Sequence, residues 1–385
     1  MSGPLSGMRV LDASMGAVGP WAGALLGGLG AEVIKLEPPR NGDFIRQIMP
    51  SKGGLSTTYQ AMNVNKRGIV LDLKIDAERE EVYRLARDAD IFIENFRPGV
   101  ADRIGVGYET LSRDNPKLIY ASACGFGFTG PMVGIGATDP HLQAFTGVAS
   151  LNGEQGAPRQ RWRWYGHMDC TTAVVIVQAV LAALLERQAT GLGRHLKITM
   201  TEAVMALQRV RLSEFLAGGK PEPMGSATTY LVPDQAFEAA DQAIAVSVTS
   251  RKQWRGFCAA IERPDLIDDA RYASNPLRVT NRDTLIPLLE DIFRTRPASF
   301  WFRRLHDAAV PATPFLTFDV FREHAHYLAN GIINIFQTEA WGQVTFGPMP
   351  WDFSATPPSL RPGTPPGGAN EEVLKHGWKR PEAAE

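Results

Sequence analysis

The sequence contains only three cysteines in 385 residues, too few and too scattered for a disulfide framework. Cys124, Cys170 and Cys258 also lack the CxxC spacing of a zinc knuckle. The histidines include no pair at i and i+4, the spacing at which two residues of a helix bind one metal ion. We therefore expect no metal site and a reducing, cytoplasmic location.

An excess of charge is missing as well, because 40 basic residues nearly balance 41 acidic ones, for a formal net charge of -1. Without a basic excess, we expect binding neither to nucleic acid nor to an anionic membrane surface. The start, MSGPLSGMRVLD, does not have the pattern of a signal peptide. We also expect no apolar segment to reach the roughly 18 residues of a membrane span, which predicts a soluble, unsecreted protein.

Two common site motifs are absent. The turn SMGAVGP, residues 14–20, has the spacing GxxGP instead of the dinucleotide fingerprint GxGxxG, which disfavours a nicotinamide-dependent oxidoreductase. There is no GxSxG nucleophile elbow. Gly16 and Gly19 would still allow a phosphate to approach free backbone amides of the turn, although a purely structural tight turn is the alternative.

Short β-branched runs alternate with helix-period segments over residues 8–124, as in MRVLDA, EVIKLE, GIVLDLK and DIFIENF. This alternation predicts βαβ units, an α/β class and an open, mostly parallel sheet. The chain exceeds the ~250–300 residues at which one core stops growing. From residue 226 the isolated strand AIAVSVTS and the amphipathic segment NRDTLIPLLEDIF predict a smaller α+β domain. We therefore expect a large domain over 1–220, a small domain over 226–325, and a segment 326–385 that returns to the large domain.

Basic and aromatic residues follow the ends of the predicted strands. In a parallel sheet these ends form the ligand crevice, where arginine can bind phosphate oxygens with two hydrogen bonds. Solvated loop charges are the alternative. The residues are Lys66, Arg67, Lys74, Asn95, Phe96, Arg97 and Arg103.

Asp169 precedes a long segment, 171–186, that is apolar on nearly all sides and so predicts a helix in the middle of the molecule. If Asp169 is the N-cap of this helix, its carboxylate would accept hydrogen bonds from backbone amides, and the helix dipole would keep it ionised. Alternatively it is a nucleophile at the mouth of a pocket. The neighbouring Cys170 is expected to be a buried packing residue. The run RQRWRW, 159–164, reads as an edge strand, or as the source of an arginine for a carboxylate ligand.

Six motifs carry a family resemblance: PLSGMRVLD, LGAEVIKLEPP, NVNKRGIVLDLK, ENFRPGVADRIGVGYETL, ATDPHLQAFTG and TGLGRHLKITMTEA. In this order they resemble class III coenzyme A transferases and the related α-methylacyl-CoA racemases, over nearly the whole chain. The resemblance implies a Rossmann-like large domain, a small domain and an interlocked homodimer. It also implies an acyl-CoA donor and a carboxylic acid acceptor as substrates, with CoA as substrate and no permanently bound cofactor.

The resemblance further implies roles for individual residues. Asp169 takes the place of the nucleophile that forms a mixed anhydride and then an aspartyl-CoA thioester. Many members carry an arginine where this chain has Pro38, and Arg40 is expected to substitute. The glycine-rich loop 125–130 is a candidate source of amides for the oxyanion. The implied CoA contacts are Gly16, Ala17 and Val18 in the pocket, Leu71 and Lys74 beside the nucleotide, and Asn95, Phe96, Arg97 and Arg103 along the chain and phosphates.

Two alternatives stay open. A racemase needs a histidine before the first aspartate as one of its two proton-transfer groups, but this chain has Thr138 before Asp139. Racemases also carry glycines after the second aspartate, where this chain has Cys170. The transferase is therefore favoured. The other alternative is a non-catalytic CoA-binding subunit of a heteromeric transferase, which the presence of Asp169 disfavours.

Overall fold

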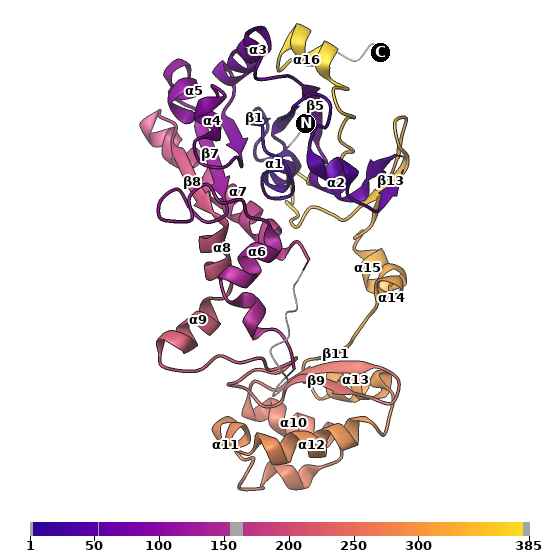
Figure 1. Ribbon diagram of the computed structural model, residues 1–385. Helices are drawn as coiled ribbons and strands as arrows, with labels where there is room; N and C mark the ends of the chain where they lie inside the picture. The colour runs from indigo at the N-terminus through magenta and orange to yellow at the C-terminus, as the bar shows by residue number, and fades with distance from the viewer. Residues whose placement is uncertain (1–2, 53, 155–164, 380–385) are drawn as a thin grey trace. The chain divides into compact units, whose positions relative to one another are not determined.

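The computed structural model describes residues 3–52, 54–154 and 165–379, which form two compact units (Figure 1). The first unit holds the residues up to Val148, a middle stretch that ends at Gly219, and the stretch from Ala329 onward. The second unit holds Lys220–Leu328 and the short stretch that begins at Ala149.

A six-stranded parallel sheet organises the first unit, which confirms the predicted α/β class with a mostly parallel sheet. Its spatial order is β5-β2-β1-β6-β7-β8. Along the chain these are the third, second, first, fourth, fifth and sixth strands of the sheet, which is the Rossmann order. The strands are β1 (Arg9–Asp12), β2 (Glu32–Glu37), β5 (Lys66–Val70), β6 (Ile91–Glu94), β7 (Ile119–Cys124) and β8 (His195–Thr199).

The two faces of this sheet carry separate hydrophobic cores, because successive side chains of a strand point to opposite faces. Val10 of β1 belongs to the core with α1 and α7, whereas Leu11 belongs to the core with α3 and α5. The helices of this unit are α1 (Val18–Gly28), α2 (Thr57–Met62), α3 (Asp76–Arg87), α4 (Val100–Arg103), α5 (Tyr108–Asp114), α6 (Asp139–Phe145), α7 (His167–Thr190), α8 (Met200–Leu207), α9 (Arg209–Leu216) and α16 (Asn370–His376).

Helix α7 begins earlier and ends later than the predicted segment 171–186. It also corrects the expectation that no apolar segment is as long as a membrane span. An 18-residue window within its 24 residues has a mean hydropathy of 2.0, so one helix of the described chain is long and apolar enough to cross a membrane. Length and composition do not distinguish a membrane span from the core helix of a soluble protein. Ile176 and Val180 of α7 are fully buried in the core that α7 shares with α1.

The C-terminal segment covers the outer edge of the sheet at β5 (Figure 1). The Asn370 side chain accepts a hydrogen bond from the Val70 amide at 2.8 Å and donates one to the Val70 carbonyl at 3.1 Å. The Gly68 amide donates to the Thr364 hydroxyl at 2.6 Å, and the Gly68 carbonyl accepts from the Ala369 amide at 3.0 Å. The tail thereby satisfies edge groups that would otherwise be open to pairing with another chain.

Replacing Asn370 should loosen this cover. Asn370→Ala removes both hydrogen bonds to Val70, so we expect a loss of about 1–3 kcal/mol in the free energy of unfolding. Urea denaturation measures the change. Glu371→Ala, at the next position and exposed, is the matched control and should change stability by about 0.5 kcal/mol or less. Equal losses in the two variants would contradict the role of the Asn370 amide.

The second unit contains a three-stranded antiparallel sheet and its own aromatic core. The rings of Phe237 and Phe293 stack with centroids 4.7 Å apart, and Trp254 and Phe257 are buried beside them. Its strands are β9 (Asp234–Glu238), β10 (Ala243–Ser247) and β11 (Ala312–Pro314). Its helices include α10 (Arg251–Ala260), α11 (Asn275–Thr280), α12 (Arg282–Phe293), α13 (Ala298–Asp307) and α14 (Phe318–Glu323).

The remaining elements are short. They are β3 (Ser51–Lys52), β4 (Leu55–Ser56), β12 (Asn334–Thr338), β13 (Gly342–Phe346), α15 (Ala325–Ala329), and the 3-10 helices η1 (Phe44–Gln47), η2 (Val148–Leu151) and η3 (Pro264–Ile267).

Candidate functional site

A cavity of about 1230 Å³ lies in the first unit, between the loops that follow β1, β6 and β7. The chain crosses over in opposite directions from β1 and β6, and this switch point is where ligands of open α/β sheets bind. Most of the lining comes from the ends of strands and the starts of helices. It consists of Met15–Val18 after β1, Asn95–Pro98 after β6, Ala123–Gly127 at the end of β7, Gly134–Pro140 before and in α6, Tyr165–Gly166 and Asp169–Cys170 at α7, seven residues between Phe44 and Met62 in and around η1 and α2, and the single residues Val100, Met132 and Met200.

Side chains hold the turn after β1. The Asn95 amide group accepts a hydrogen bond from Met15 N at 2.8 Å and donates to Met15 O at 2.7 Å, so it joins the turn to the loop after β6. The Gly16 amide donates to the Asp43 carboxylate at 2.9 Å. The amides of Met15 and Gly16 are thus occupied by these side chains, and only the other amides of the turn could bind a phosphate. Gly16 has φ +82, and a Cβ there would lie 3.1 Å from the Phe44 ring.

Asp169 lines the cavity and is half-buried. The N-cap of α7 is Gly166, in the left-handed region at φ 70, so the interpretation of Asp169 as an N-cap is wrong. Asp169 lies instead in the first helical turn, and no described residue forms a hydrogen bond with its carboxylate. Burial and the charge of Asp139 raise the pKa of Asp169 to about 7, which outweighs the helix dipole. Within the described chain its carboxylate is therefore unengaged, and it faces a cavity.

Asp139 is a site residue that the sequence reasoning used only to test for a racemase. It is 5% exposed, lines the same cavity and begins α6. One carboxylate oxygen accepts a hydrogen bond from the Met168 amide at 2.8 Å, and the other accepts from the Gln143 side chain. Asp139 therefore fixes the first turn of α7 and with it the position of Asp169. Its place in the motif ATDPHLQAFTG was the available sequence signal.

The structure brings together some of the predicted CoA contacts and leaves others outside the cavity. Gly16, Ala17, Val18, Asn95, Phe96 and Arg97 line it with Asp169. Arg40, Leu71, Lys74 and Arg103 are not in the lining, and their contacts with CoA stay predictions. Leu71 is 4% exposed in the core beside α3, whereas the other three are exposed.

Two basic residues of the candidate set have carboxylate partners. Lys66 forms an ion pair with Asp12 at 2.8 Å, and Arg67 pairs with Glu372 at 2.7 Å and also with Glu32. Neither charge is available to a phosphate. Arg97 differs, because it is the single cationic side chain in the described lining. Its guanidinium lies against Gly136, where a Cβ would be 2.6 Å from Nη2.

The glycine-rich loop after β7 contributes Gly125, Phe126 and Gly127 to the lining. A Cβ on Gly125 would clash with the Ala137 side chain, so glycine is needed for the loop to approach the segment before α6. Gly127 has φ +123, a conformation that other residues rarely adopt. The loop therefore approaches the cavity closely at its two glycines, with Phe126 between them.

Two thiols line the cavity beside Asp169. Cys170 is half-buried in the lining, so it is not the buried packing residue that the sequence suggested. Burial raises the pKa of the Cys124 thiol to about 11, and burial and the two carboxylates raise the pKa of Cys170. Both thiols are protonated at neutral pH and are poor nucleophiles. Over residues 3–52, 54–154 and 165–379 no group of three His, Cys, Asp or Glu side chains could hold a metal ion.

The run RQRWRW, at 159–164, lies outside the described residues. The candidate arginine for a carboxylate ligand therefore stays a prediction.

Comparison with known proteins identifies what the chain resembles. The family model described as CoA-transferase family III matches residues 5–371. The acetyl-CoA:oxalate CoA-transferase of Acetobacter aceti is 35% identical over 315 residues, which cover 82% of this chain and 81% of that protein. The succinyl-CoA:glutarate CoA-transferase of Mus musculus is 33% identical over 334 residues, 86% of this chain and 76% of that protein. The crystal structure of a CAIB/BAIF family protein from Brucella suis has a TM-score of 0.85 at 29% identity, covering 97% of this chain and 99% of that one.

Proposed function

Since the chain belongs to CoA-transferase family III, we propose that it moves coenzyme A from an acyl-CoA thioester to a free carboxylic acid, with Asp169 as the nucleophile. The main support is the unengaged Asp169 carboxylate, which faces a cavity at the switch point of a Rossmann sheet. Arg97 is the available cation for phosphate or carboxylate oxygens there. The named CoA-transferases among the relatives are consistent with this activity.

The proposed reaction is a series of acyl exchanges. A carboxylate oxygen of Asp169 attacks the thioester carbonyl, the C–S bond breaks, and CoA thiolate leaves a mixed anhydride. The thiolate then attacks the Asp169 carbonyl of the anhydride, which releases the donor acid and forms an aspartyl-CoA thioester. The acceptor carboxylate attacks this thioester, and the released thiolate takes the acceptor acyl group from the second anhydride. Asp169 is regenerated as a carboxylate, with no net proton transfer.

Each tetrahedral intermediate needs hydrogen-bond donors for its oxyanion, and each such donor lowers the barrier by about 2.7–4 kcal/mol. The amides of Gly125 and Phe126 are the proposed donors, because both residues line the cavity, whereas the Gly127 amide donates to the Cys124 thiol. The protonated thiols of Cys124 and Cys170 do not compete with CoA thiolate for the anhydride.

The interlocked homodimer is likewise a proposal. In the first unit, α7 contacts α8 and α8 contacts α9. All three helices expose large apolar side chains. Such exposed apolar surface is typical of protein interfaces, and we propose that the second protomer covers it. The residues are Val174, Leu185, Leu207, Val210, Phe215 and Leu216.

A substrate panel tests the function. The purified protein is mixed with pairs of acyl-CoA donors and carboxylic acids, and new thioesters are measured by mass spectrometry. Exchange of CoA between acids, with a mass adduct on Asp169 when donor alone is supplied, is the expected result. Deuterium incorporation at the α-carbon in D₂O without any new thioester would instead support a racemase. Activity that appears only on addition of a second chain would support the non-catalytic subunit.

The raised pKa of Asp169 predicts an acid limb in the pH profile. Only the ionised carboxylate attacks, so kcat/KM should fall about tenfold per pH unit below a pKa of about 7. Asp139→Asn removes a negative charge that raises this pKa, so the limb should shift to lower pH. The amide oxygen of the new side chain can still accept from Met168 N. Rates measured over roughly pH 5–9 check the shift.

The matched control for this profile is Asp114→Asn, a carboxylate that is 54% exposed and pairs with Arg87 on the surface. Its acid limb should coincide with that of the unchanged protein. An Asp139→Asn profile that also coincides would show that Asp139 does not influence the charge of the nucleophile.

A further inference from the structure

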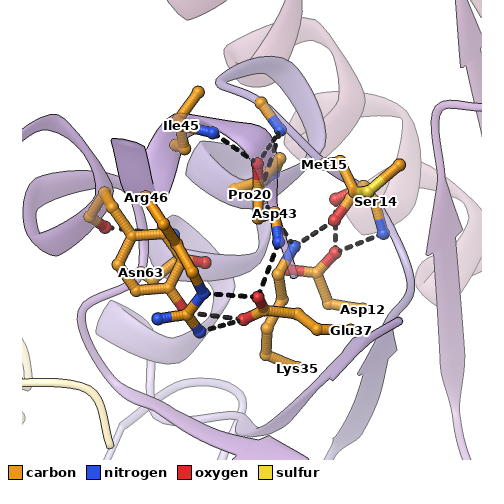
Figure 2. Close-up of polar contacts among 12 residues, drawn as sticks. Asp12, Ser14, Met15, Pro20, Lys35, Glu37, Asp43, Ile45, Arg46 and Asn63 are labelled. Carbon is orange, nitrogen blue, oxygen red and sulfur yellow. Dashed lines mark hydrogen bonds and ion pairs between the residues drawn. The ribbon is translucent and has the colours of Figure 1, made fainter. Parts of the chain in front are cut away.

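Six charged side chains are buried directly behind the turn after β1 (Figure 2). Three are acidic and three are basic, so the group is neutral as a whole. All but Arg46 are at most 3% exposed, and the Arg46 side chain is 8% exposed. We call this set the buried ion cluster; its members are Asp12, Lys35, Glu37, Asp43, Arg46 and Lys66.

A contribution to the stability of the fold does not by itself explain why these charges are buried. Taking charges out of water costs several kcal/mol per ion, and apolar replacements of a buried ion pair are often neutral, or stabilising by about 1–4 kcal/mol. The charges instead fix the positions of neighbouring segments, because each buried carboxylate requires hydrogen-bond donors at defined places around it.

Asp43 links the cluster to two parts of the cavity wall. Both of its carboxylate oxygens accept from the single Gly16 N–H, at 2.9 and 3.0 Å, and one of them also accepts from the Ile45 amide at 3.2 Å (Figure 2). The first contact fixes the turn Met15–Val18, and the second caps η1. Lys35 approaches the same carboxylate at 3.5 Å and donates to the carbonyl of Ser14.

The other end of the cluster holds α2. Arg46 of η1 binds Glu37 through Nε at 2.6 Å, and the Tyr59 hydroxyl of α2 donates to Glu37 at 2.6 Å. The Asp43 amide also donates to Glu37 at 2.8 Å. The turn, η1 and α2 therefore share one set of buried charges. All three line the cavity, η1 and α2 through residues such as Phe44, Ile45 and Met62.

We propose that Asp43 is a positioning residue for acyl-CoA binding, because its buried carboxylate fixes the turn Met15–Val18 against the wall formed by η1 and α2. The proposal rests on the function proposed above. Asp43 is not in the cavity lining and acts through Gly16 and Ile45. Loss of its carboxylate leaves the turn free to move, so acyl-CoA must then order the turn when it binds, and this ordering weakens the binding.

Kinetics of Asp43→Ala and Asp43→Asn test the proposal. Asp43→Ala should raise KM for the acyl-CoA donor about tenfold or more, while KM for the acceptor acid stays unchanged and kcat changes much less. Asp43→Asn should lie between, because its single oxygen can still accept from Gly16 but its NH₂ group cannot. Glu32→Gln is the matched control: it removes an ion pair with Arg67 in the same sheet, outside the cavity, and should leave both KM values unchanged.

Titration calorimetry with free CoA separates this proposal from the proposed function. If no acid exchanges CoA, the function fails, and the ratio of CoA dissociation constants still tests Asp43. Should Asp43→Ala fail to fold, Asp43→Asn provides the same comparison. A folded variant that binds CoA as tightly as the unchanged protein, with only its melting temperature lowered, would overturn the positioning role.

Discussion

Asp169→Ala is expected to reduce CoA transfer at least about a thousandfold, since loss of a nucleophile leaves only the contribution of substrate binding and oxyanion donors. Folding should be unaffected, because the carboxylate is half-buried and engages no described hydrogen-bond partner. The dissociation constant for CoA should also remain similar. The rate of new thioester formation, calorimetry with CoA and the thermal melting curve measure the three quantities.

The control for this variant lies on the same helix. Glu186→Ala removes an exposed side chain near the other end of α7, whose partner is Arg194 at 2.7 Å, and should leave transfer unchanged. The intact mass after exposure to donor gives a second readout, because Asp169→Ala should carry no adduct. Transfer by Asp169→Ala within about tenfold of the original rate would remove Asp169 from the chemistry.

Lys66→Met is expected to cause the largest loss of stability, about 3–5 kcal/mol, because it leaves a buried charge without its partner. Lys66 Nζ lies 2.8 Å from Asp12 Oδ2, and both side chains are at most 1% exposed. Asp12 would keep only Lys35 as a nearby cation. The free energy of unfolding in guanidinium chloride measures the loss.

Two further variants sharpen this experiment. Lys117→Met changes an exposed lysine and should cost about 0.5 kcal/mol or less. The double variant Asp12→Leu with Lys66→Met removes both charges, and it should recover part of the loss because no unpaired ion remains. A double variant less stable than Lys66→Met alone would mean that Asp12 matters chiefly through its hydrogen bond from the Ser14 amide, at 3.0 Å.

The sheet was predictable from sequence because its signal is local. Most of the buried parallel strands contain β-branched residues in short apolar runs, such as EVIKLE and IFIE, and charged helices such as α3 have their own periodicity. The strand ends then indicated the crevice, and Asn95, Phe96 and Arg97 do line it. The start of α7 was less predictable. The sequence placed the helix after Asp169, but Gly166 and the hydrogen bond from Met168 to Asp139 begin it earlier.

The hydrogen bonds and ion pairs within the site join residues that are distant in sequence, and no local sequence pattern reveals such pairs. Asp43 meets Gly16 across 27 positions, and Lys66 meets Asp12 across 54. Asn95 lines the cavity as predicted, its contact with CoA stays a prediction, and its side chain also binds Met15, 80 positions away. A motif indicates that such a residue matters, but only the fold shows whether it meets the ligand or another loop.

The tail that covers β5 also has a consequence for biosynthesis. Val70 and Asn370 are 300 positions apart, so the outer strand is made long before the segment that protects it. During translation the nascent sheet presents bare backbone groups to other chains, a state prone to aggregation. A nascent chain that has not yet reached Thr364 and Asn370 should therefore remain bound by chaperones, whereas a chain that includes both residues closes this edge itself.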